Sequence, residues 1–371
     1  MSAIDRTNGA SERAPTARLG PIVKRSGSRD VLNVGVVGLG YWGPNRVRAF
    51  TEIPDVAVSY ICDTDPARLE VAERRYPLAR PTLDFQEIVR DPGIDAVVVA
   101  TPASSHFALA SQALEHGKHA FVEKPLAASS LEATQLAETA EELGLVLMCG
   151  HTFLYSPPVR KVKQLVEAGE LGELYFISSR RVNLGPYRSD VSVISDLGPH
   201  DFSILLYWLG ESAAWVSAVG RDVISQGIAD VAFVDISFPD GLLSHVELSW
   251  LAPSKLRRTV VVGSKKMLVY EDGHAEPVRI FDSGIEYRDP ESYGEYHLSY
   301  RTGDIVSPRV DSTEPIVAEL EHFVDAIATS SAPESSPWLA IEAIRLVEAA
   351  EASMADGGRQ VSVGAAPVEL S

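Results

Sequence analysis

Three side chains that could act on a hydroxyl group stand in two short segments of the chain. Lys124 lies between an apolar run and a proline in the segment VEKP, while Asp196 and His200 share the segment SDLGPHD. An ammonium group in a closed cleft is a strong donor to a developing alkoxide, and a neutral imidazole can accept a proton near pH 7. These residue types favour acid–base chemistry on an alcohol, although Lys124 could instead be a surface lysine paired with Glu123.

The position of His200 suggests how its imidazole could stay neutral. The apolar run after Pro199 predicts a buried helix over residues 199–209, with His200 in its first turn. The positive end of the helix dipole would then lower the pKa of the imidazole. Asp196 could orient the ring, bind a substrate or cap the helix. A histidine on a buried helix can also be an ordinary core residue, so a catalytic role needs support from another motif.

A glycine-rich turn gives that support. The segment GLGYWG carries Gly38, Gly40 and Gly43, with Tyr41 and Trp42 between them, directly after the first apolar run and before a helix. We expect all five residues to contact a dinucleotide cofactor. In such a turn the first glycine allows a tight bend, the second lets the backbone approach a pyrophosphate, and the third lets the helix pack on the strand. Because hydride transfer from a secondary alcohol needs a base for the hydroxyl proton, a dinucleotide turn favours a catalytic histidine.

The end of the second predicted strand indicates which dinucleotide would bind. Asp63 stands there, and its carboxylate could accept both ribose hydroxyls of NAD and would repel the 2′-phosphate of NADP. Thr64 and Asp65 supply no compensating cation, so NAD is favoured over NADP. An aspartate here could also cap the next helix, but Asp65 before Pro66 suits that role and would leave Asp63 free.

The spacing of the apolar runs predicts the fold that positions these residues. From residue 31 to about 150, short β-branched runs alternate with amphipathic stretches, which is typical of a parallel sheet covered by helices on both faces. The predicted strands are 31–37, 56–62, 95–100, 119–122 and 145–149, and the predicted helices are 43–52, 66–75, 84–90, 104–116 and 130–142.

After about residue 152 the pattern changes to longer alternating segments separated by turn signals, which predicts a largely antiparallel sheet with one covered face. Helices are predicted at 157–168, 199–209, 315–329 and 338–355. We therefore expect an α/β fold with three parts: a flexible tail at 1–30, an NAD-binding Rossmann domain at 31–150, and an α+β domain for substrate binding and oligomerisation at 151–371, whose last helices could pack back on the Rossmann domain.

Composition and charge exclude several classes of protein. Of the 371 residues, 45% are hydrophobic and 23% are charged, as in ordinary globular proteins. A formal net charge of −18 disfavours nucleic acid and anionic membranes as partners. No apolar run reaches the roughly 20 residues of a membrane span. The two cysteines stand apart and the histidines lack partners at metal-ligand spacing, so we expect a cytoplasmic protein without a metal site.

Two further features could contact a substrate. His151 follows the last predicted strand of the first region and could face a cleft between the domains. A local basic cluster lies near the end of the first long strand of the second region and consists of Arg180, Arg181, Asn183, Tyr187 and Arg188. This cluster could receive an anion such as a nucleotide diphosphate, or it could be a solvated strand end.

Four motifs occur together, in the order VVGLGYWGPN (36–45), ATPASSH (100–106), EKP (123–125) and DLGPH (196–200). This combination resembles the Gfo/Idh/MocA (glucose-fructose oxidoreductase / inositol dehydrogenase) family over nearly the whole chain from about residue 31. The resemblance implies a Rossmann domain followed by an α+β domain with an open, mostly antiparallel sheet. It also implies a homodimer or homotetramer formed through that sheet.

The resemblance further implies roles for individual residues. Lys124 would contact the reacting sugar hydroxyl, Asp196 would bind substrate, and His200 would be the general acid/base. The nicotinamide side of the cofactor would be lined by Thr101, Pro102, His106 and Glu123. The substrate would also be contacted by His151, Tyr155, Arg181 and Asn183.

Several segments are most similar to the nucleotide-sugar branch of the family, namely 151–157, 181–210 and 303–315. We therefore expect NAD-dependent hydride transfer at a sugar ring carbon, C3 of a UDP-N-acetylglucosamine-type sugar or of a 3-keto dTDP-sugar. Ser195 departs from that branch, where a bulkier aromatic residue is expected before the aspartate. The alternatives are an inositol or free-sugar dehydrogenase and, from another class, a regulatory protein that binds NAD(H) without turnover.

Overall fold

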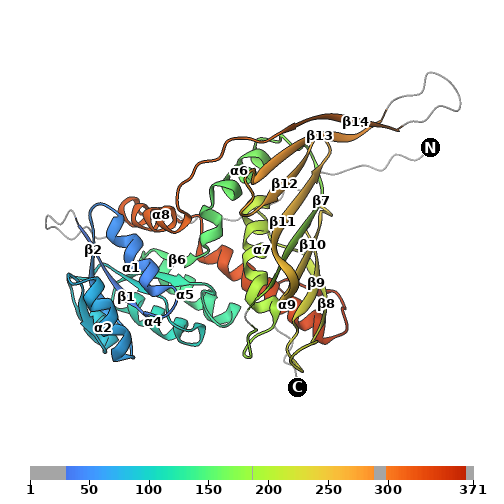
Figure 1. Cartoon of the computed structure of the whole chain (residues 1–371). Helices are drawn as coiled ribbons and strands as arrows, with labels where there is room; N and C mark the ends of the chain where they lie inside the picture. The colour runs from blue at the N-terminus through green and yellow to red at the C-terminus, as the bar shows by residue number, and fades with distance from the viewer. Residues whose placement is uncertain (1–30, 186, 288–297, 365–371) are drawn as a thin grey trace, which may run out of the picture.

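The computed structural model describes residues 31–364 except 186 and 288–297, so the predicted tail at 1–30 lies outside the described residues. The N-terminal half forms a six-stranded parallel sheet in the order β3-β2-β1-β4-β5-β6 (Figure 1). Its strands are β1 (Leu32–Val37), β2 (Val56–Cys62), β3 (Arg80–Thr82), β4 (Ala96–Val99), β5 (His119–Glu123) and β6 (Leu147–Gly150). Its helices are α1 (Gly43–Glu52), α2 (Pro66–Arg75), α3 (Phe85–Arg90), α4 (His106–Glu115) and α5 (Ser130–Leu143).

The strand order reverses between β1 and β4, because the chain runs outward from β1 to β3 and then returns to the other side of β1. All four residues of β4 are buried, as expected for a strand with helices on both faces. The carboxyl ends of β1 and β4 therefore form the switch point at which open α/β sheets bind their ligands.

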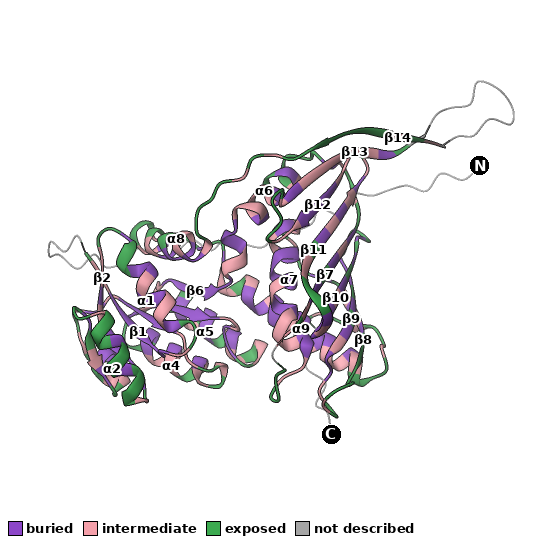
Figure 2. Cartoon of the chain, in the orientation of Figure 1, coloured by how far each residue is buried: buried purple, intermediate pink, exposed green. Residues whose placement is uncertain are grey.

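The second sheet has nine strands in the order β14-β13-β12-β11-β7-β10-β9-β8-β15. Neighbouring strands pair antiparallel except β7 and β10, which are parallel. The bounds are β7 (Leu174–Leu184), β8 (Trp215–Arg221), β9 (Val231–Ser237), β10 (Leu243–Ser249), β11 (Leu251–Gly263), β12 (Met267–Glu271), β13 (Val278–Tyr287), β14 (Leu298–Val306) and β15 (Val361–Ser362). Residues in β9 and β10 alternate between buried and exposed, so one face of this sheet is covered by helices and the other faces outward (Figure 2).

Helices connect the two sheets. The segments η2 (Thr152–Tyr155) and α6 (Pro157–Glu167) lead out of the first sheet, and α7 (Val193–Leu209) packs against β7, β9 and β10. Near the C-terminus, α8 (Pro315–Thr329) packs on α1 and η2, while α9 (Pro337–Ala355) contacts α5, α7 and β8 (Figure 1). None of the helices formed by the described residues is long and apolar enough to cross a membrane.

The predicted start of one functional helix was wrong. α7 begins at Val193 rather than at 199, because the Ser192 hydroxyl accepts the backbone N–H groups of Ile194 and Ser195 and so caps the helix. Pro199 consequently lies inside α7, and His200 lies beyond its first turn. The helix dipole is therefore not the reason for a neutral imidazole at this position.

Candidate active site between the two sheets

Lys124 follows β5 in the first half of the molecule and reaches across to α7 in the second half. Its Nζ donates a hydrogen bond to the backbone carbonyl of Asp196 at 3.2 Å. Pro199 lacks the N–H that an ordinary residue would offer to the carbonyl of Ser195, one residue before Asp196, so α7 is weakened at this turn. Burial lowers the pKa of Lys124. The alternative of a surface lysine paired with Glu123 is wrong, because the Glu123 carboxylate is paired with Arg46.

Asp196 lies in the first turn of α7, and its carboxylate is held from two sides. Trp250 Nε1 donates to Asp196 Oδ2 at 3.1 Å, and Arg188 Nη1 lies 3.7 Å from Oδ1. Helix capping is done by Ser192, so the capping alternative for Asp196 is wrong. Ser195 donates to Glu351 of α9 at 2.8 Å, and its side chain is therefore tied to the helix layer.

His200 is surrounded by positive charge. Burial lowers the pKa of its imidazole well below the usual value, and the nearby cations Lys124, Arg181 and Arg257 lower it further. The ring centroid of Phe153 lies 5.1 Å from that of His200 in an edge-to-face contact. The imidazole is therefore neutral near pH 7 and can accept a proton, through burial and not through the helix dipole.

His151 is a second buried imidazole in this group. It follows β6 with 4% of its surface exposed, and burial together with Lys124 lowers its pKa to about 3. Its Nδ1 atom has no hydrogen-bond partner among the described residues. Because buried polar atoms are normally satisfied, this nitrogen is a candidate to bond a ligand.

The glycine turn has the geometry expected of a pyrophosphate cradle. Gly38 has φ of +90°, a backbone conformation that residues with a side chain rarely adopt. A Cβ at Gly43 would lie 1.9 Å from the Gly38 carbonyl oxygen. The fold therefore requires glycine at both positions. A Cβ at Gly40 would meet nothing closer than Arg68 Nη1, at 3.8 Å. The space in front of Gly40 is therefore open, and it lies at the positive N-terminal end of α1, where a dinucleotide pyrophosphate fits.

Asp63 is not free, which corrects one prediction. Its Oδ2 accepts the backbone N–H of Leu39 at 2.6 Å, and its Oδ1 accepts the N–H of Asp65 at 2.9 Å. Each carboxylate oxygen has a second lone pair, which a ribose hydroxyl could use. Asp65 caps α2 as predicted, by accepting the N–H of Ala67. Arg68 is a further residue at this position that no sequence motif indicated, and its Nη1 lies 3.7 Å from Asp63 Oδ2.

His106 holds two strand-end loops together. Its Nδ1 lies 2.7 Å from the carbonyl oxygen of Pro125, and its Nε2 lies 2.8 Å from that of Thr101. Both ring nitrogens are thus engaged by backbone, and the residue is 1% exposed. Thr101 and Pro102 lie in the loop after β4, beside the glycine turn, since a Cβ at Gly38 would approach Ala100 and Thr101. A direct contact of these residues with nicotinamide stays a prediction.

Arg180 and Arg181 of the predicted cluster lie on opposite faces of β7. Arg181 is buried and pairs with Asp201, whereas Arg180 pairs with Glu247 at 2.8 Å and is half exposed. Successive residues of a strand point to opposite faces, so these two arginines cannot act together. Arg181 Nη1 is buried without a partner among the described residues. Arg188 pairs with Asp190 at 2.6 Å.

Tyr155 is placed in the core and not in the cleft. The residue is 1% exposed, its hydroxyl lies 3.0 Å from Nδ1 of His322 on α8, and it accepts the N–H of Ser335. The predicted contact of Tyr155 with substrate is therefore wrong, because its only polar atom joins η2 to the C-terminal helices. Asn183 lies near the end of β7 with its side chain against the backbone of Gly185.

A buried ionic network beneath the site was not predicted. Arg46 of α1 pairs with Glu123, donates to Glu319 of α8 at 2.5 Å, and donates to Thr152 Oγ1 at 3.1 Å. Glu123 precedes Lys124, and Thr152 lies between His151 and Phe153, so the network fixes both strand ends that carry site residues. Arg46 and Glu319 are separated by 273 positions in the chain, and no local pattern indicates their contact.

Lys124, Asp196, His200, His151 and Arg181 therefore gather where the two halves of the molecule meet. Among the described residues, no group of three or more His, Cys, Asp or Glu side chains could hold a metal ion. The fold and this site define a dinucleotide-dependent oxidoreductase with a separate substrate-binding half.

Comparison with known proteins gives the family. Residues 32–151 match the model described as "Oxidoreductase family, NAD-binding Rossmann fold", and residues 159–269 match the GFO/IDH/MocA C-terminal domain. The chain belongs to the Gfo/Idh/MocA family. It is an NAD-dependent oxidoreductase that acts on CH–OH groups, in a family that includes dehydrogenases of sugars and polyols.

Individual relatives differ in substrate. UDP-N-acetylglucosamine 3-dehydrogenase from Acidithiobacillus ferrooxidans is 30% identical over 61% of this chain and 70% of the relative. The NAD(+)-dependent scyllo-inositol 2-dehydrogenase of Bacillus subtilis is 27% identical over 81% of this chain and 88% of the relative. The crystal structure of GenD2 from gentamicin A biosynthesis, in complex with NAD, has a TM-score of 0.76 and 27% identity, and the match covers 93% of this chain and 100% of that one.

Proposed function

We propose that the protein oxidises a secondary ring hydroxyl of a sugar, with His200 as the general base and Lys124 as the donor to the developing alkoxide. The observation that carries this proposal is the hydrogen bond from Lys124 Nζ to the Asp196 carbonyl. It places an ammonium group from the first half beside the helix that carries the neutral imidazole of His200.

Each side chain of the site has its own role in the proposed reaction. The neutral His200 takes the hydroxyl proton as the C–O bond gains double-bond character, and Lys124 stabilises the partial negative charge on that oxygen. Asp196, held by Trp250 and Arg188, accepts a neighbouring hydroxyl and fixes the ring. NAD, when bound along the glycine turn, supplies the nicotinamide carbon that receives the hydride.

For the substrate, we propose a nucleotide sugar that is oxidised at C3. The likeness to UDP-N-acetylglucosamine 3-dehydrogenase supports this substrate class. Arg181 also supports it, because this arginine is buried near Lys124 and His200 and keeps an Nη1 group without a partner among the described residues. A charge-assisted bond from this group to a phosphate or to a sugar oxygen would satisfy it.

A second candidate is oxidation of an inositol or a free sugar. Arg180, Arg181 and Arg188 each already pair with a carboxylate, which leaves less positive charge for a diphosphate. The likeness to scyllo-inositol 2-dehydrogenase supports this reading.

The test is a substrate panel with NAD reduction followed at 340 nm by the absorbance of the reduced cofactor. Faster turnover of UDP-N-acetylglucosamine than of N-acetylglucosamine, glucose or myo-inositol supports the nucleotide sugar. Faster turnover of a free sugar or inositol supports the second candidate. Tight NADH binding without turnover of any sugar would contradict both and favour the regulatory alternative.

We also propose a homodimer or homotetramer formed through the outer face of the second sheet. Exposed apolar side chains on this face support this arrangement, namely Phe176, Val219, Phe233, Leu243 and Ile285. Apolar clusters of this kind mark protein interfaces. Light scattering after size-exclusion chromatography gives the mass of the assembly, and a monomer at micromolar concentration would contradict the proposal.

A further inference from the structure

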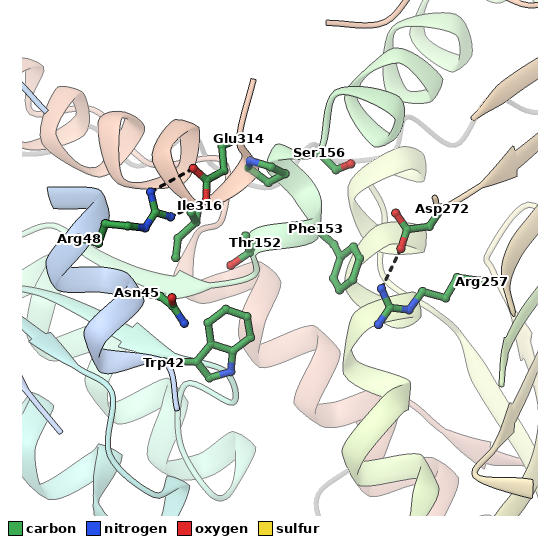
Figure 3. Close-up of a pocket in the computed structure, with 11 residues that line it drawn as sticks. Trp42, Asn45, Arg48, Thr152, Phe153, Ser156, Arg257, Asp272, Glu314 and Ile316 are labelled. Atoms are coloured by element: carbon green, nitrogen blue, oxygen red, sulfur yellow. Dashed lines mark hydrogen bonds and ion pairs between the residues drawn. The ribbon is translucent and has the colours of Figure 1, made fainter. Parts of the chain in front are cut away.

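A pocket outside the group formed by Lys124, Asp196 and His200 opens between the two halves of the molecule (Figure 3). Its volume of about 410 Å³ lies within the range of roughly 300–1,000 Å³ that is usual for small-molecule sites. It is bounded by α1, by η2, by β11, by the turn after β12, and by the start of α8. Its lining includes Trp42, Asn45, Arg48, Phe153, Arg257 and Glu314.

Two aromatic side chains from different halves face this pocket. Trp42 is 43% exposed, and the guanidinium carbon of the buried Arg46 lies 5.9 Å from its ring centroid. Phe153 forms part of the opposite wall, together with the Arg257 guanidinium, whose central carbon lies 5.1 Å from the Phe153 ring centroid. Because Phe153 also contacts the His200 ring, the pocket begins one side chain away from the proposed base.

The charged groups in the pocket already neutralise one another. Arg48 is paired with Glu314, and Arg257 lies 2.8 Å from Asp272 (Figure 3). No surplus charge is therefore available for an ionic ligand. The exposed indole of Trp42 is the dominant recognition surface, and an aromatic ring of this kind stacks on flat, uncharged rings.

The pocket borders the turn expected to hold the cofactor, because Trp42 is the N-cap residue of α1. A pyrophosphate would lie in front of Gly40, at the N-terminus of α1. The pocket instead extends along the flank of that helix, where Asn45 and then Arg48, one turn further, contribute to its wall. We expect a ligand here to lie beside the bound cofactor, and the use of NAD-saturated protein tests this.

We propose that this pocket binds a second, uncharged ring of the substrate, stacked on Trp42, while the first ring reacts between Lys124 and His200. The inference rests on the proposed function and narrows its substrate class to molecules with two ring systems. The second ring is either the base of a nucleotide sugar, which is planar and stacks on the indole, or a second pyranose, which can pack a face of C–H groups against it.

The binding test uses tryptophan fluorescence of NAD-saturated protein, so that the cofactor groove is filled. Uridine and N,N′-diacetylchitobiose serve as probes for the base and for the second pyranose. We expect at least one probe to quench the emission saturably in the wild type and not in Trp42→Phe. Trp338→Phe is the matched control, because this tryptophan is 46% exposed on α9 and does not line the pocket; quenching should persist in that variant.

Three results would overturn the subsite. They are the lack of saturable quenching by either probe, quenching that persists in Trp42→Phe, and quenching by the probes that appears only in the absence of NAD. The last result would assign the pocket to the cofactor. Which probe quenches then distinguishes a nucleobase from a sugar as the second ring.

The kinetic test separates the subsite from the proposed function. At saturating NAD, Trp42→Ala should raise KM for a two-ring substrate at least about tenfold more than it raises KM for N-acetylglucosamine, given the usual strength of base–aromatic stacking. The comparison of the two substrates cancels any weakening of cofactor binding, because Trp42 is also part of the glycine turn. Equal changes for both substrates would contradict a second-ring site. If the probes bind at Trp42 but no sugar is oxidised, the subsite stands and the proposed reaction fails.

Discussion

Replacement of Lys124 by methionine tests the proposed division of labour between the ammonium group and the imidazole. Methionine keeps an unbranched chain of similar length but removes the charge and the three N–H donors. In the wild type one donor binds the Asp196 carbonyl. Within the described part of the chain the other two have no assigned acceptor, so they can bind the reacting oxygen.

The expected loss follows from the location of the lysine. Loss of one preorganised donor to a developing oxyanion typically costs about 2.7–4 kcal/mol, or roughly 10²–10³ in kcat. Lys124 is partly buried at the junction of the two halves, where solvent screening is weak, so we expect kcat to fall by about this factor. NAD affinity should be retained, because the glycine turn is formed by other residues.

The same substitution should move the pH profile in a defined direction. The positive charge of Lys124 is one of the causes that lower the pKa of His200, after burial itself. Removal of that charge therefore raises the pKa of the imidazole, and the base becomes protonated at a higher pH. The acidic limb of the kcat/KM profile should therefore shift to higher pH. The pKa of His200 should still lie below that of a free imidazole, because the imidazole remains buried.

The assay is steady-state NAD reduction from pH 5 to 9 with the best substrate of the panel. Lys266→Met is the control, because Lys266 is a surface lysine 2.8 Å from Glu170 and far from the site in sequence and structure. An unchanged kcat in Lys124→Met would refute the role of the ammonium group. A reduced kcat with an acidic limb that does not move, or moves downward, would refute the electrostatic coupling to His200.

Three further predictions follow from the same geometry. His200→Ala should lower kcat/KM by about 10²–10⁴ while the Kd for NAD, measured by calorimetry, stays unchanged; normal turnover would remove it as the base. Gly40→Ala should retain the wild-type Tm but lose NAD affinity, because a Cβ at this position meets no backbone atom of the protein. Gly43→Ala should lower Tm, because its Cβ would collide with the Gly38 carbonyl oxygen. Equal changes of Tm and of NAD affinity in the two variants would contradict the pyrophosphate cradle. Burial raises the pKa of Glu319 from 4.5 to about 7. Between these two pH values the folded chain keeps a proton on Glu319 that the unfolded chain releases. The free energy of unfolding of the wild type therefore falls as pH rises from 4.5 to 7. Denaturation between pH 4.5 and 7 should therefore show a decline on the order of 3 kcal/mol that Glu319→Gln lacks, and parallel curves would contradict the raised pKa.

The first half of the fold could be predicted because its signals are local. The bounds of α1 and α2 agree with the predicted 43–52 and 66–75, since a proline near the start of each helix, and for α2 a capping aspartate, act within a few residues. β3 was missed because its three residues, Arg80–Thr82, carry no apolar pattern. The start of α7 was misplaced because Pro199 was taken as a first-turn residue, whereas the cap is Ser192.

The candidate site was only partly predictable, because its partners are distant in the chain. Glycine spacing and the two catalytic motifs are visible in sequence. The contact of Asp196 with Trp250 spans 54 positions, and the contact of Arg46 with Glu319 spans 273. Only the packing of the two halves creates such pairs. The arginine cluster was misjudged for a related reason, since strand alternation and buried aspartate partners decide which guanidinium faces the cleft.

The central claim is that a ring carbon of a sugar gives its hydride to the cofactor between Lys124 and His200. The most direct measurement is isotope transfer: wild-type protein is incubated with NAD and UDP-N-acetylglucosamine deuterated at C3, and the reduced cofactor is examined by mass spectrometry and NMR. The account predicts deuterium at nicotinamide C4 in the wild type and far less in His200→Ala. Reduced cofactor without deuterium would contradict transfer from C3, and the absence of any reduced cofactor from this and from every other sugar would contradict the account as a whole.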